Sequence, residues 1–362
     1  MAFTAGPVSP PHNPNNDVLL NQPPDDTVQS LAFSPQALAP KSFLVSASWD
    51  NQVRCWEVQS NGQSNPVGMT KHQGPVLDVS WASDGQSIFS AGADKIAQMW
   101  QISANKTTTV AAHDAPIRHI FYCKDMGNGS PCLVTGSWDK TIKYWDIRSP
   151  TGTPMGSVPL SDKVYCMDAR APLLVVGTAD RKLRVYDIRK PAVVFHEKLA
   201  QLKYQLRCLA TFPDQSGYAV GSIEGRVSID HVHEKDRKNL DFAFKCHRDP
   251  DNNVIYPVNS ISFHEQHGTF ATAGGDGGFN FWDKDNKHRL KQFQRMNQPI
   301  TATAFSTDGN IFAYAVGYDW SKGAAHHNPG TDRKYILLHS VQLAEVKGKR
   351  NSNKLGVGGN RR

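Results

Sequence analysis

The chain has 362 residues, of which 39% are hydrophobic, and its 22 prolines and 28 glycines are spread along its length. Nowhere do eighteen apolar residues follow one another, and the N-terminus has no basic segment before an apolar run, so we expect neither membrane insertion nor secretion. The last seventeen residues hold six Lys or Arg and no acid, and they account for all but one unit of the net charge of +7. A body that is basic overall is therefore excluded, and any basic binding site must be local.

The two ends of the chain differ in composition from the part between them. The first fifteen residues are rich in Pro and Asn, and residues 346–362 are basic, so we predict a disordered tail at 1–15 and another at 346–362. The folded domain is predicted to span residues 16–345. Its six cysteines are scattered without a CxxC pair, which is typical of reduced, packed thiols in an intracellular protein rather than of disulfides or a metal site.

A repeat organises this domain. Six segments each combine a strand of alternating apolar residues, a tight turn and a second strand, at residues 46–58, 90–102, 135–147, 176–188, 220–232 and 272–284. The residue six places after the turn acid is aromatic in five of the six segments, at Trp56, Trp100, Trp145, Tyr186 and Trp282, and it is Asp230 in the remaining one. A period of about 40 to 50 residues made of short strands predicts the four-stranded blades of an all-β propeller.

A seventh unit begins at "ITATAF" (300–305) and continues through "KYILLHSV" (334–341), where it lacks a fourth strand. The segment "NDVLLNQ" (16–22) precedes the first blade and has no blade of its own. We therefore predict a seven-bladed propeller that an N-terminal strand near Val18 to Leu20 closes, because closure removes the exposed edges of an open ring.

No enzymatic motif is present: the chain has no GxSxG elbow, GxxxxGK[ST] loop or HExxH pair. His231 and His233 alternate on one predicted strand, but no third metal ligand is nearby. We expect no catalytic residues, no metal and no cofactor, and a binding scaffold is the class of function that is left.

The repeat resembles the WD-repeat family over about residues 16–341, six copies making the match strong. In that family a His, a Ser or Thr, a turn Asp and a Trp form a hydrogen-bonded set, which the third blade supplies as His113, Ser137, Asp139 and Trp145. Blade two has Gly92 in place of the Ser or Thr. A buried imidazole and a buried indole each need a partner, so these residues are expected to be structural.

The turns between the second and third strands of all blades lie on one rim of a propeller. They place two tryptophans and four basic residues there, Trp49, Lys95, Trp138, Lys140, Arg181 and Arg226. Solvated turn lysines are the ordinary interpretation of each one alone, but exposed Trp and Arg together are typical of interfaces. The rim is therefore predicted to bind an acidic peptide with apolar anchors. Blade five also has Glu224 and Asp230 at unusual positions, which makes Arg226 the first candidate for the contact.

A second basic zone follows the sixth blade, with Lys284, Lys287, Arg289, Lys291 and Arg295 within twelve residues. It is either a solvated outer edge or a track for a phosphate backbone with bases stacked on nearby aromatics. The sequence leaves these two interpretations open.

Four segments, "SIEGRVSI", "FKCHR", "FWDKD" and "GNIFAYAVGYDWSKG", resemble the messenger-RNA export factors of the nuclear pore, with "YDWSKG" absent from ordinary WD repeats. The resemblance implies a propeller that binds the acidic GLEBS segment of a Phe-Gly-repeat nucleoporin, with Trp49 and Arg226 at matching contact positions. It also implies a nucleic-acid surface, which is a strip of six residues, Phe244, Trp282, Asp283, Lys284, Lys287 and Arg289. This surface role of Trp282 conflicts with the core position that the repeat predicts for the same residue.

The same resemblance implies a nuclear and nuclear-pore location with a cytoplasmic fraction, single-stranded RNA as a second partner, and a single propeller paired with its nucleoporin. The alternative is a spindle-checkpoint type of WD-repeat adaptor, which binds GLEBS-like segments of checkpoint kinases. A G-protein β subunit would need a long N-terminal helix, which the Pro- and Asn-rich start cannot form. A ubiquitin-ligase receptor would need a further domain.

Overall fold

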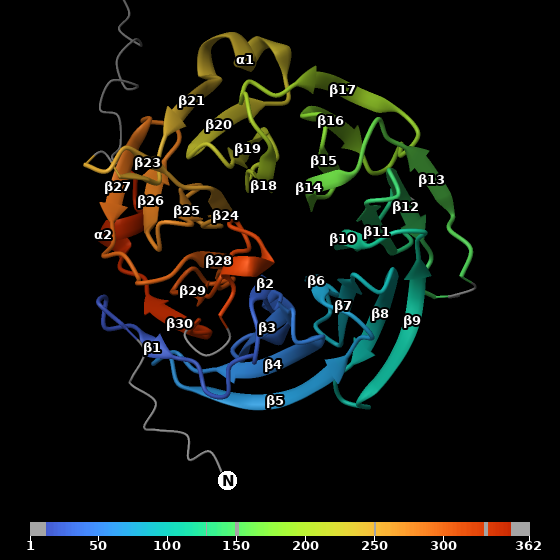
Figure 1. The fold of residues 1–362 in the computed structure, drawn as a ribbon. Coiled ribbons are helices and arrows are strands. Elements are labelled where there is room, and N and C mark those ends of the chain that lie inside the picture. Colours follow the sequence, from blue (N-terminus) through green and yellow to red (C-terminus); the bar gives the residue numbers. More distant parts are fainter. Residues whose placement is uncertain (1–11, 128, 149–151, 250, 329–331, 349–362) are drawn as a thin grey trace, which may run out of the picture.

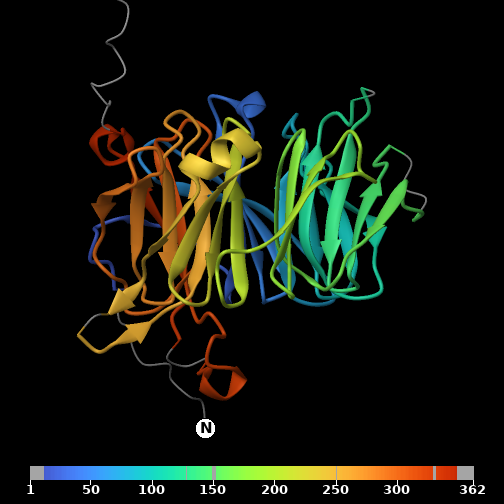
Figure 2. The same cartoon turned by 90° about the horizontal axis from the view of Figure 1, so that it is seen from above.

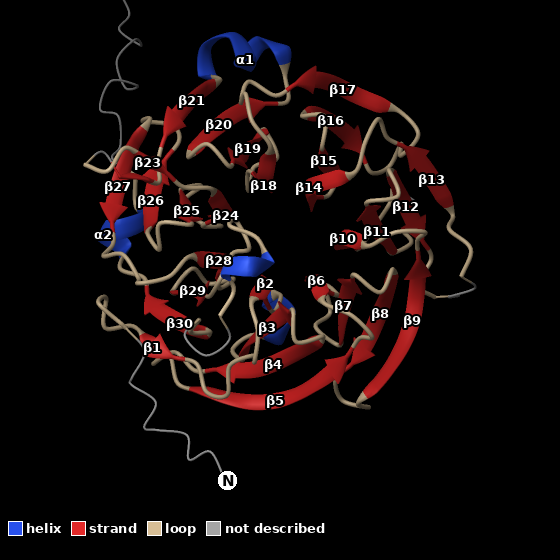
Figure 3. Ribbon diagram, viewed as in Figure 1, coloured by secondary structure: helices blue, strands red, loops and turns tan. Residues whose placement is uncertain are grey.

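A computed structural model describes residues 12–348 apart from residues 128, 149–151, 250 and 329–331. The chain forms a ring of seven four-stranded antiparallel sheets around a central channel (Figure 1), which confirms the predicted all-β, seven-bladed propeller. Most of the two predicted tails, at 1–15 and 346–362, lies outside the described residues. Figure 3 shows how small the helical share of the ring is.

Each blade runs from an innermost strand to an outermost one in chain order, except the last. The first three blades comprise β2 (Val28–Phe33), β3 (Ser42–Ser48), β4 (Gln52–Val58) and β5 (Ser64–Lys71); β6 (Val76–Trp81), β7 (Ser87–Gly92), β8 (Ile96–Gln101) and β9 (Lys106–Ala112); and β10 (Ile117–Cys123), β11 (Cys132–Ser137), β12 (Thr141–Trp145) and β13 (Gly156–Pro159).

The next three blades comprise β14 (Val164–Arg170), β15 (Leu173–Thr178), β16 (Lys182–Asp187) and β17 (Val194–Leu199); β18 (Leu206–Thr211), β19 (Gly217–Ser222), β20 (Arg226–His231) and β21 (Phe242–Lys245); and β24 (Val258–Phe263), β25 (Phe270–Gly274), β26 (Phe279–Asp283) and β27 (His288–Gln292). The seventh blade comprises β28 (Ile300–Phe305), β29 (Ile311–Val316), β30 (Tyr335–Ser340) and β1 (Val18–Leu19).

The N-terminal strand closes the ring as predicted. β1 pairs antiparallel with β30, Val18 opposite Leu338 and Leu19 opposite Leu337. The strand is short, and neighbouring side chains hold it as well. Leu20 is fully buried, and Asp17 accepts hydrogen bonds from the Tyr314 hydroxyl at 2.6 Å and from His339 Nδ1 at 2.7 Å. Closure thus joins the two ends of the domain through the core of one blade.

The core lies between neighbouring blades rather than inside any one of them. The second strand of a blade, such as β11 or β19, is buried along its whole length, whereas outer strands such as β13 and β21 alternate half-buried and exposed residues. A strand that is covered on both faces reads as a continuous apolar run, and a strand that faces water on one side alternates. Trp56, Trp100 and Trp145 are among the largest buried side chains.

Short elements project from both faces of the disc (Figure 2). The hairpin of β22 (Arg248–Asp249) and β23 (Val254–Ile255) and the 3-10 turn η2 (Ala324–His326) extend from the face that carries the turns between second and third strands, which we call the rim face. The opposite face carries η1 (Gln36–Leu38) and α2 (Leu343–Val346), and α1 (Glu234–Leu240) lies outside blade five. Within the described residues, no helix has the length and apolar character that a membrane crossing needs.

Candidate functional site

Buried histidine networks hold the rim-face turns of three blades in place. In the third blade His113 Nδ1 lies 2.7 Å from Asp139 Oδ2, and His113 Nε2 lies 2.7 Å from Thr135 Oγ1. Trp145 Nε1 donates to the same Thr135 oxygen at 2.8 Å. The result is a continuous chain from the core indole through Thr135 and His113 to the turn carboxylate.

This geometry corrects one member of the predicted set. Thr135 rather than Ser137 joins His113 to Trp145, while Ser137 accepts from the Asp139 backbone N–H at 3.0 Å and donates to the Ala115 and Pro116 carbonyls. The reason is the strand register. Trp145 lies opposite Leu133, so its indole reaches the hydroxyl of Thr135, two residues after Leu133, rather than that of Ser137 at the turn. Asp139, His113 and Trp145 have the structural roles that the sequence predicted.

The pKa values within this network follow from burial and from hydrogen bonding. Burial lowers the pKa of His113, and Asp139 opposes that shift without overcoming it. Burial would raise the pKa of Asp139, but hydrogen bonds from Thr141 and the interaction with His113 outweigh it and leave that pKa below its ordinary value. A neutral imidazole therefore donates to an ionised carboxylate, which needs no ligand from outside.

Two further blades repeat the arrangement, one of them where the sequence did not point. In blade two His72 contacts Asp94 Oδ2 and Ser90 Oγ. Ser90 thus supplies the hydroxyl that Gly92 lacks. In blade six His247 contacts Asp276 at 2.8 Å and Thr272 at 2.9 Å, and Trp282 Nε1 donates to Thr272. The β22–β23 hairpin separates His247 from its blade, which hid the set, although a Ser or Thr four residues before each turn Asp would have revealed it.

The rim-face turns share one backbone conformation that points their basic side chains outward. Asn51, Lys95, Lys140, Arg181, Gly225 and Gly277 occupy equivalent turn positions with φ between 60° and 72°. Lys95 and Lys140 are exposed, and Lys140 lies 3.4 Å from Asp162. Arg181 instead donates to the Leu202 and Lys203 carbonyls and is partly engaged in its own blade. Of the predicted rim cations, Lys95, Lys140 and Arg226 thus keep at least partly exposed side chains that a partner can reach, although Lys140 lies beside Asp162 and Arg226 beside Glu224.

Arg226 begins β20 and keeps about a third of its side chain exposed. Its Nε lies 3.6 Å from Glu224 Oε2, which is beyond a strong hydrogen bond, and the Glu224 side chain also accepts from the Lys203 backbone N–H at 3.0 Å. Exposed apolar side chains flank this turn, namely Tyr204, Ile223, Val254 and Ile255. Arg226 is therefore a cation beside an apolar surface.

The other anomaly of blade five is structural. Asp230 is fully buried, and its carboxylate accepts from Lys198 of the neighbouring blade, from Gln201 Nε2 at 3.1 Å and from Ser228 Oγ at 2.8 Å. It replaces the usual Trp contact with an ionic link between blades four and five. The departure at Asp230 thus has a packing cause and no direct role at the rim.

The two predicted rim tryptophans line one cavity at the mouth of the channel. Trp49 stacks on Trp320 with ring centroids 4.9 Å apart and donates to Gln29 Oε1 at 3.2 Å, and Trp138 is 36% exposed on the opposite wall. Trp320 also contacts Tyr318 and His327. Sequence reasoning did not assign Trp320 to the site, although "YDWSKG" marked its loop.

The predicted nucleic-acid strip lies across blades five and six, where cations cover aromatic rings. Phe244 lies 4.6 Å from the Trp282 ring, the Arg289 guanidinium lies 5.9 Å over Trp282, and Lys287 Nζ lies 4.8 Å over Phe242. Trp282 has its core position in the blade, where it donates to Thr272, and Phe244 and Arg289 pack against its ring, so its contact with nucleic acid stays a prediction.

Two members of the strip point elsewhere. Asp283 is 5% exposed, and its carboxylate accepts from the Asp285 and Asn286 backbone N–H groups. Lys284 has little exposed side chain, pairs with Asp285 at 2.7 Å and lies 4.8 Å over Phe212. Lys287 and Arg289 are exposed and are the cations of the strip that a ligand can reach.

Other titratable groups are absorbed by local contacts. His231 bonds to Asp241, and His233 stands at the N-cap position of α1 without a side-chain hydrogen bond to the helix. Among the described residues, no group of three His, Cys, Asp or Glu side chains is arranged to hold a metal.

Comparison with known proteins identifies the family. The WD domain, G-beta repeat family matches residues 19–57, 65–101, 104–146 and 242–283. The match omits most of the two blades whose third strands carry Tyr186 and Asp230 in place of Trp, and also the strands β28 to β30 of the seventh blade. The chain is 47% identical over 335 residues to "mRNA export factor GLE2" of Chaetomium thermophilum, covering 92% of each chain. It is 46% identical over 333 residues to "Poly(A)+ RNA export protein" of Schizosaccharomyces pombe, covering 91% and 92%.

A plant relative is similar over a longer stretch. "Protein RAE1" of Arabidopsis thaliana is 48% identical over 353 residues, covering 96% of this chain and 97% of the relative. The similarity therefore extends through all seven blades and not only through those with a complete Trp-Asp pattern. With this fold and these relatives, the chain belongs to the WD-repeat family of mRNA export factors.

Proposed function

We propose that this chain is a non-enzymatic binding scaffold in the export of messenger RNA at the nuclear pore, and that its rim face binds the acidic GLEBS segment of a Phe-Gly-repeat nucleoporin. The observation that carries the proposal is that Arg226, which is partly exposed and only weakly paired with Glu224, lies on the same face as exposed apolar side chains and two tryptophans. Arg and Trp are the residue types that most often anchor interfaces. The names of the relatives supply the cellular process.

The rim is suited to an extended acidic peptide rather than to a flat protein surface. Lys95, Lys140 and Arg226 stand on turns of different blades, so a ligand that meets all three has to cross the channel mouth. The cavity there has a volume of about 280 Å³ and is lined by Trp49, Trp138 and Trp320, which offers a place for an apolar anchor. Acidic residues on either side of that anchor would then meet the cations.

The test is titration calorimetry of a synthetic GLEBS peptide against the whole chain. Arg226→Ala should weaken binding by about 2–5 kcal/mol if its pair with a peptide carboxylate is desolvated. Arg189→Ala is the matched control, because Arg189 is exposed, pairs with Asp187 and lies at the opposite end of its blade. Equal affinities for wild type and Arg226→Ala would contradict the proposed contact.

A second binding function, for single-stranded RNA, is favoured by the stacked cations of the strip. Arg289 over Trp282 and Lys287 over Phe242 combine positive charge with aromatic rings. Such pairs suit binding that tracks phosphates and stacks bases without reading their sequence. We propose this contact as an addition to the peptide site, because the strip is on the outer edge of blades five and six.

A further inference from the structure

A ring of seven side chains lines the channel just inside the rim face. Each innermost strand has a register shift after its first residue, so its second residue is left out of the ladder with the neighbouring strand. Residues that a bulge frees from pairing are often re-aimed toward a site. These seven are Gln29, Leu77, Arg118, Tyr165, Arg207, Asn259 and Thr301, and all of them line the cavity of about 280 Å³.

The ring contains two arginines whose charge has no direct counterion. Arg118 donates to the Leu77 carbonyl at 3.2 Å, and Arg207 donates to the Asp319 carbonyl at 2.9 Å. Within the described part of the chain, no carboxylate oxygen lies within 4 Å of either guanidinium. Burial lowers the pKa of Arg118, the charge of Asp78 opposes that shift in part, and the nearby charge of Arg207 adds to it. Two partly buried like charges that face one channel are a costly arrangement that an anion would relieve.

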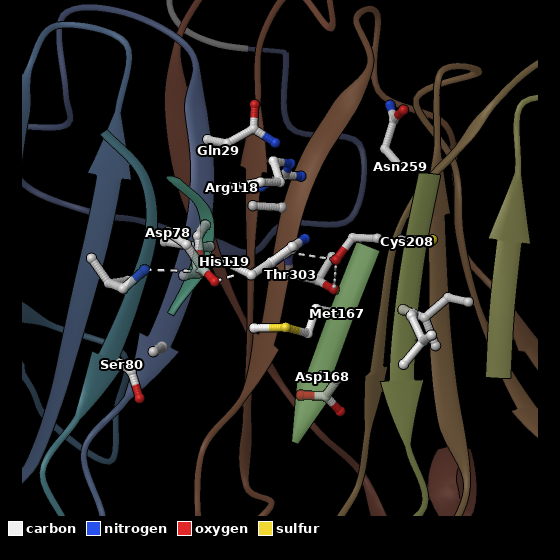
Figure 4. Close-up of a pocket in the computed structure, with 18 of the residues that line it drawn as sticks. Gln29, Asp78, Ser80, Arg118, His119, Met167, Asp168, Cys208, Asn259 and Thr303 are labelled. Carbon is white, nitrogen blue, oxygen red and sulfur yellow. Dashed lines mark hydrogen bonds and ion pairs between the residues drawn. The ribbon is translucent and has the colours of Figure 1, made fainter. Parts of the chain in front are cut away.

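The acidic groups of the channel accept hydrogen bonds from groups other than the two arginines, and only the charge of Asp78 acts on Arg118 from a distance. Asp78 Oδ2 accepts from His119 Nδ1 and from the Ile120 backbone N–H, both at 3.1 Å. Asp319 accepts from Asn259 Nδ2 at 3.1 Å through one oxygen and from Ser321 through the other. Asp168 accepts from Thr211 and lies at the other end of the channel from Gln29, Arg118 and Asn259 (Figure 4).

The remaining ring members add neutral groups and flat surfaces. Gln29 accepts from Trp49 through its oxygen, which leaves its amide N–H groups for the cavity. The Asn259 carbonyl oxygen is buried without a partner and can accept from a hydroxyl group. Tyr165, Trp138 and Trp320 line the same cavity as the two arginines and supply its aromatic walls. The cavity therefore combines two arginine side chains with aromatic walls.

We infer that this channel mouth binds a small phosphate monoester that carries a planar ring, such as a nucleoside monophosphate. The phosphate group lies between Arg118 and Arg207, since a monoester near neutral pH carries close to two negative charges and balances both guanidiniums, whereas a carboxylate balances one. The ring lies against the aromatic walls, where stacking tolerates any base. This site is separate from the outer strip, but it is the same cavity that is proposed to receive the apolar anchor of the peptide, so nucleotide and peptide should compete for it.

Titration calorimetry of the full chain with uridine monophosphate, inorganic phosphate, uridine and acetate tests the inference. We expect the nucleotide to bind more tightly than phosphate, and uridine and acetate to bind at least tenfold more weakly than the nucleotide. Arg118→Gln and Arg207→Gln should each weaken nucleotide binding by about tenfold or more, the usual effect of losing a charge-assisted hydrogen bond. Lys287→Ala with Arg289→Ala should leave it unchanged, which separates the channel from the strip.

Several results would overturn the inference. These are wild-type affinities for uridine equal to those for the nucleotide, no nucleotide binding at millimolar concentration, or undiminished binding in both arginine variants. If a glutamine variant fails to fold, Arg207→Lys is used in its place, because it keeps the charge. Its loss of nucleotide affinity should be smaller than the difference between the affinities of the wild type for the nucleotide and for acetate. The rise in melting temperature with phosphate over chloride at equal ionic strength should be larger in the wild type than in Arg118→Gln or Arg207→Gln.

Discussion

Trp49 in the first blade and Trp320 in the seventh stack with ring centroids 4.9 Å apart and an interplanar angle of 25°, across the seam where the ring closes. An offset aromatic pair contributes about 0.5–1.5 kcal/mol beyond the area that it buries. A double-mutant cycle with Trp49→Ala and Trp320→Ala, followed by urea denaturation, should give a coupling energy in that range. Trp138→Ala with Trp320→Ala is the control pair, because Trp138 has no ring stacked on it among the described residues, and its effect should be additive. Additivity in both cycles would contradict the role of the stack.

Thr135 and Ser137 both supply buried hydroxyls in β11, but only Thr135 serves two buried rings. Thr135→Val keeps the shape and leaves His113 Nε2 and Trp145 Nε1 unpaired, so we expect the free energy of unfolding to fall by about 2–5 kcal/mol. Ser137→Ala should cost less, about 1–3 kcal/mol, because its main partners are backbone groups with other contacts. The two variants are compared by chemical denaturation. A larger loss for Ser137→Ala would show that the network is centred where the sequence first suggested.

His339 links the closing strand to α2 through two carboxylates. Burial would lower its pKa, but hydrogen bonds with Asp17 and Glu345, at 2.7 Å and 3.0 Å, raise it to about 9. A pKa that is raised in the folded state adds stability that is complete below the unfolded value and is lost as pH rises through the folded value. Stability should therefore decline between about pH 6.5 and pH 9 by about 3 kcal/mol from this group, at about 1.36 kcal/mol per pKa unit.

The measurement is the free energy of unfolding of wild type and of His339→Gln at pH 6, 7.5 and 9. We expect the variant to be less stable at pH 6, with the gap closing toward pH 9. A constant gap across that range would show that the imidazole contributes by shape and neutral hydrogen bonds alone.

Lys95 has φ of 71° in an exposed rim turn, a conformation that costs an L-residue roughly 1–2 kcal/mol and glycine almost nothing. Lys95→Gly should therefore raise the free energy of unfolding by about 0.5–1 kcal/mol, after the greater entropy of glycine in the unfolded chain is allowed for. Lys106→Gly, at an exposed position at the start of β9, is the control and should lower it. If Lys95→Gly also weakens binding of an acidic peptide, the strained turn is maintained for its cation.

The strip should show its RNA contact through salt dependence. Lys287→Ala with Arg289→Ala should flatten the slope of log affinity against log salt by about 1.4, since a single strand gives about −0.7 per phosphate neutralised. Lys71→Ala with Lys106→Ala removes two exposed charges from other blades and is the matched control. The chain should end at Gly348 to remove the basic terminus, because Val346 is buried and its carbonyl accepts from Thr269. An unchanged slope would make the strip a solvated edge.

The sequence by itself determined the architecture, because a blade is a local unit with a local signature. The turn Asp, the aromatic six residues later and the period of the repeat gave seven blades, and the unpaired segment near Val18 gave the closure. His113, Asp139 and Trp145 could be assigned for the same reason, since their spacing within one repeat sets which groups must satisfy one another.

Tertiary structure decided what depends on strand register and on contacts between repeats. That Thr135 rather than Ser137 completes the network depends on strand register, and that His247 belongs to blade six depends on where the β22–β23 hairpin folds back. The burial of Lys284, the Trp49–Trp320 stack and the pairing of Arg118 with Arg207 in one channel join residues from different blades. A repeat fixes each blade's own spacing but not which side chains converge when seven blades close into a ring, and the candidate sites lie where they converge.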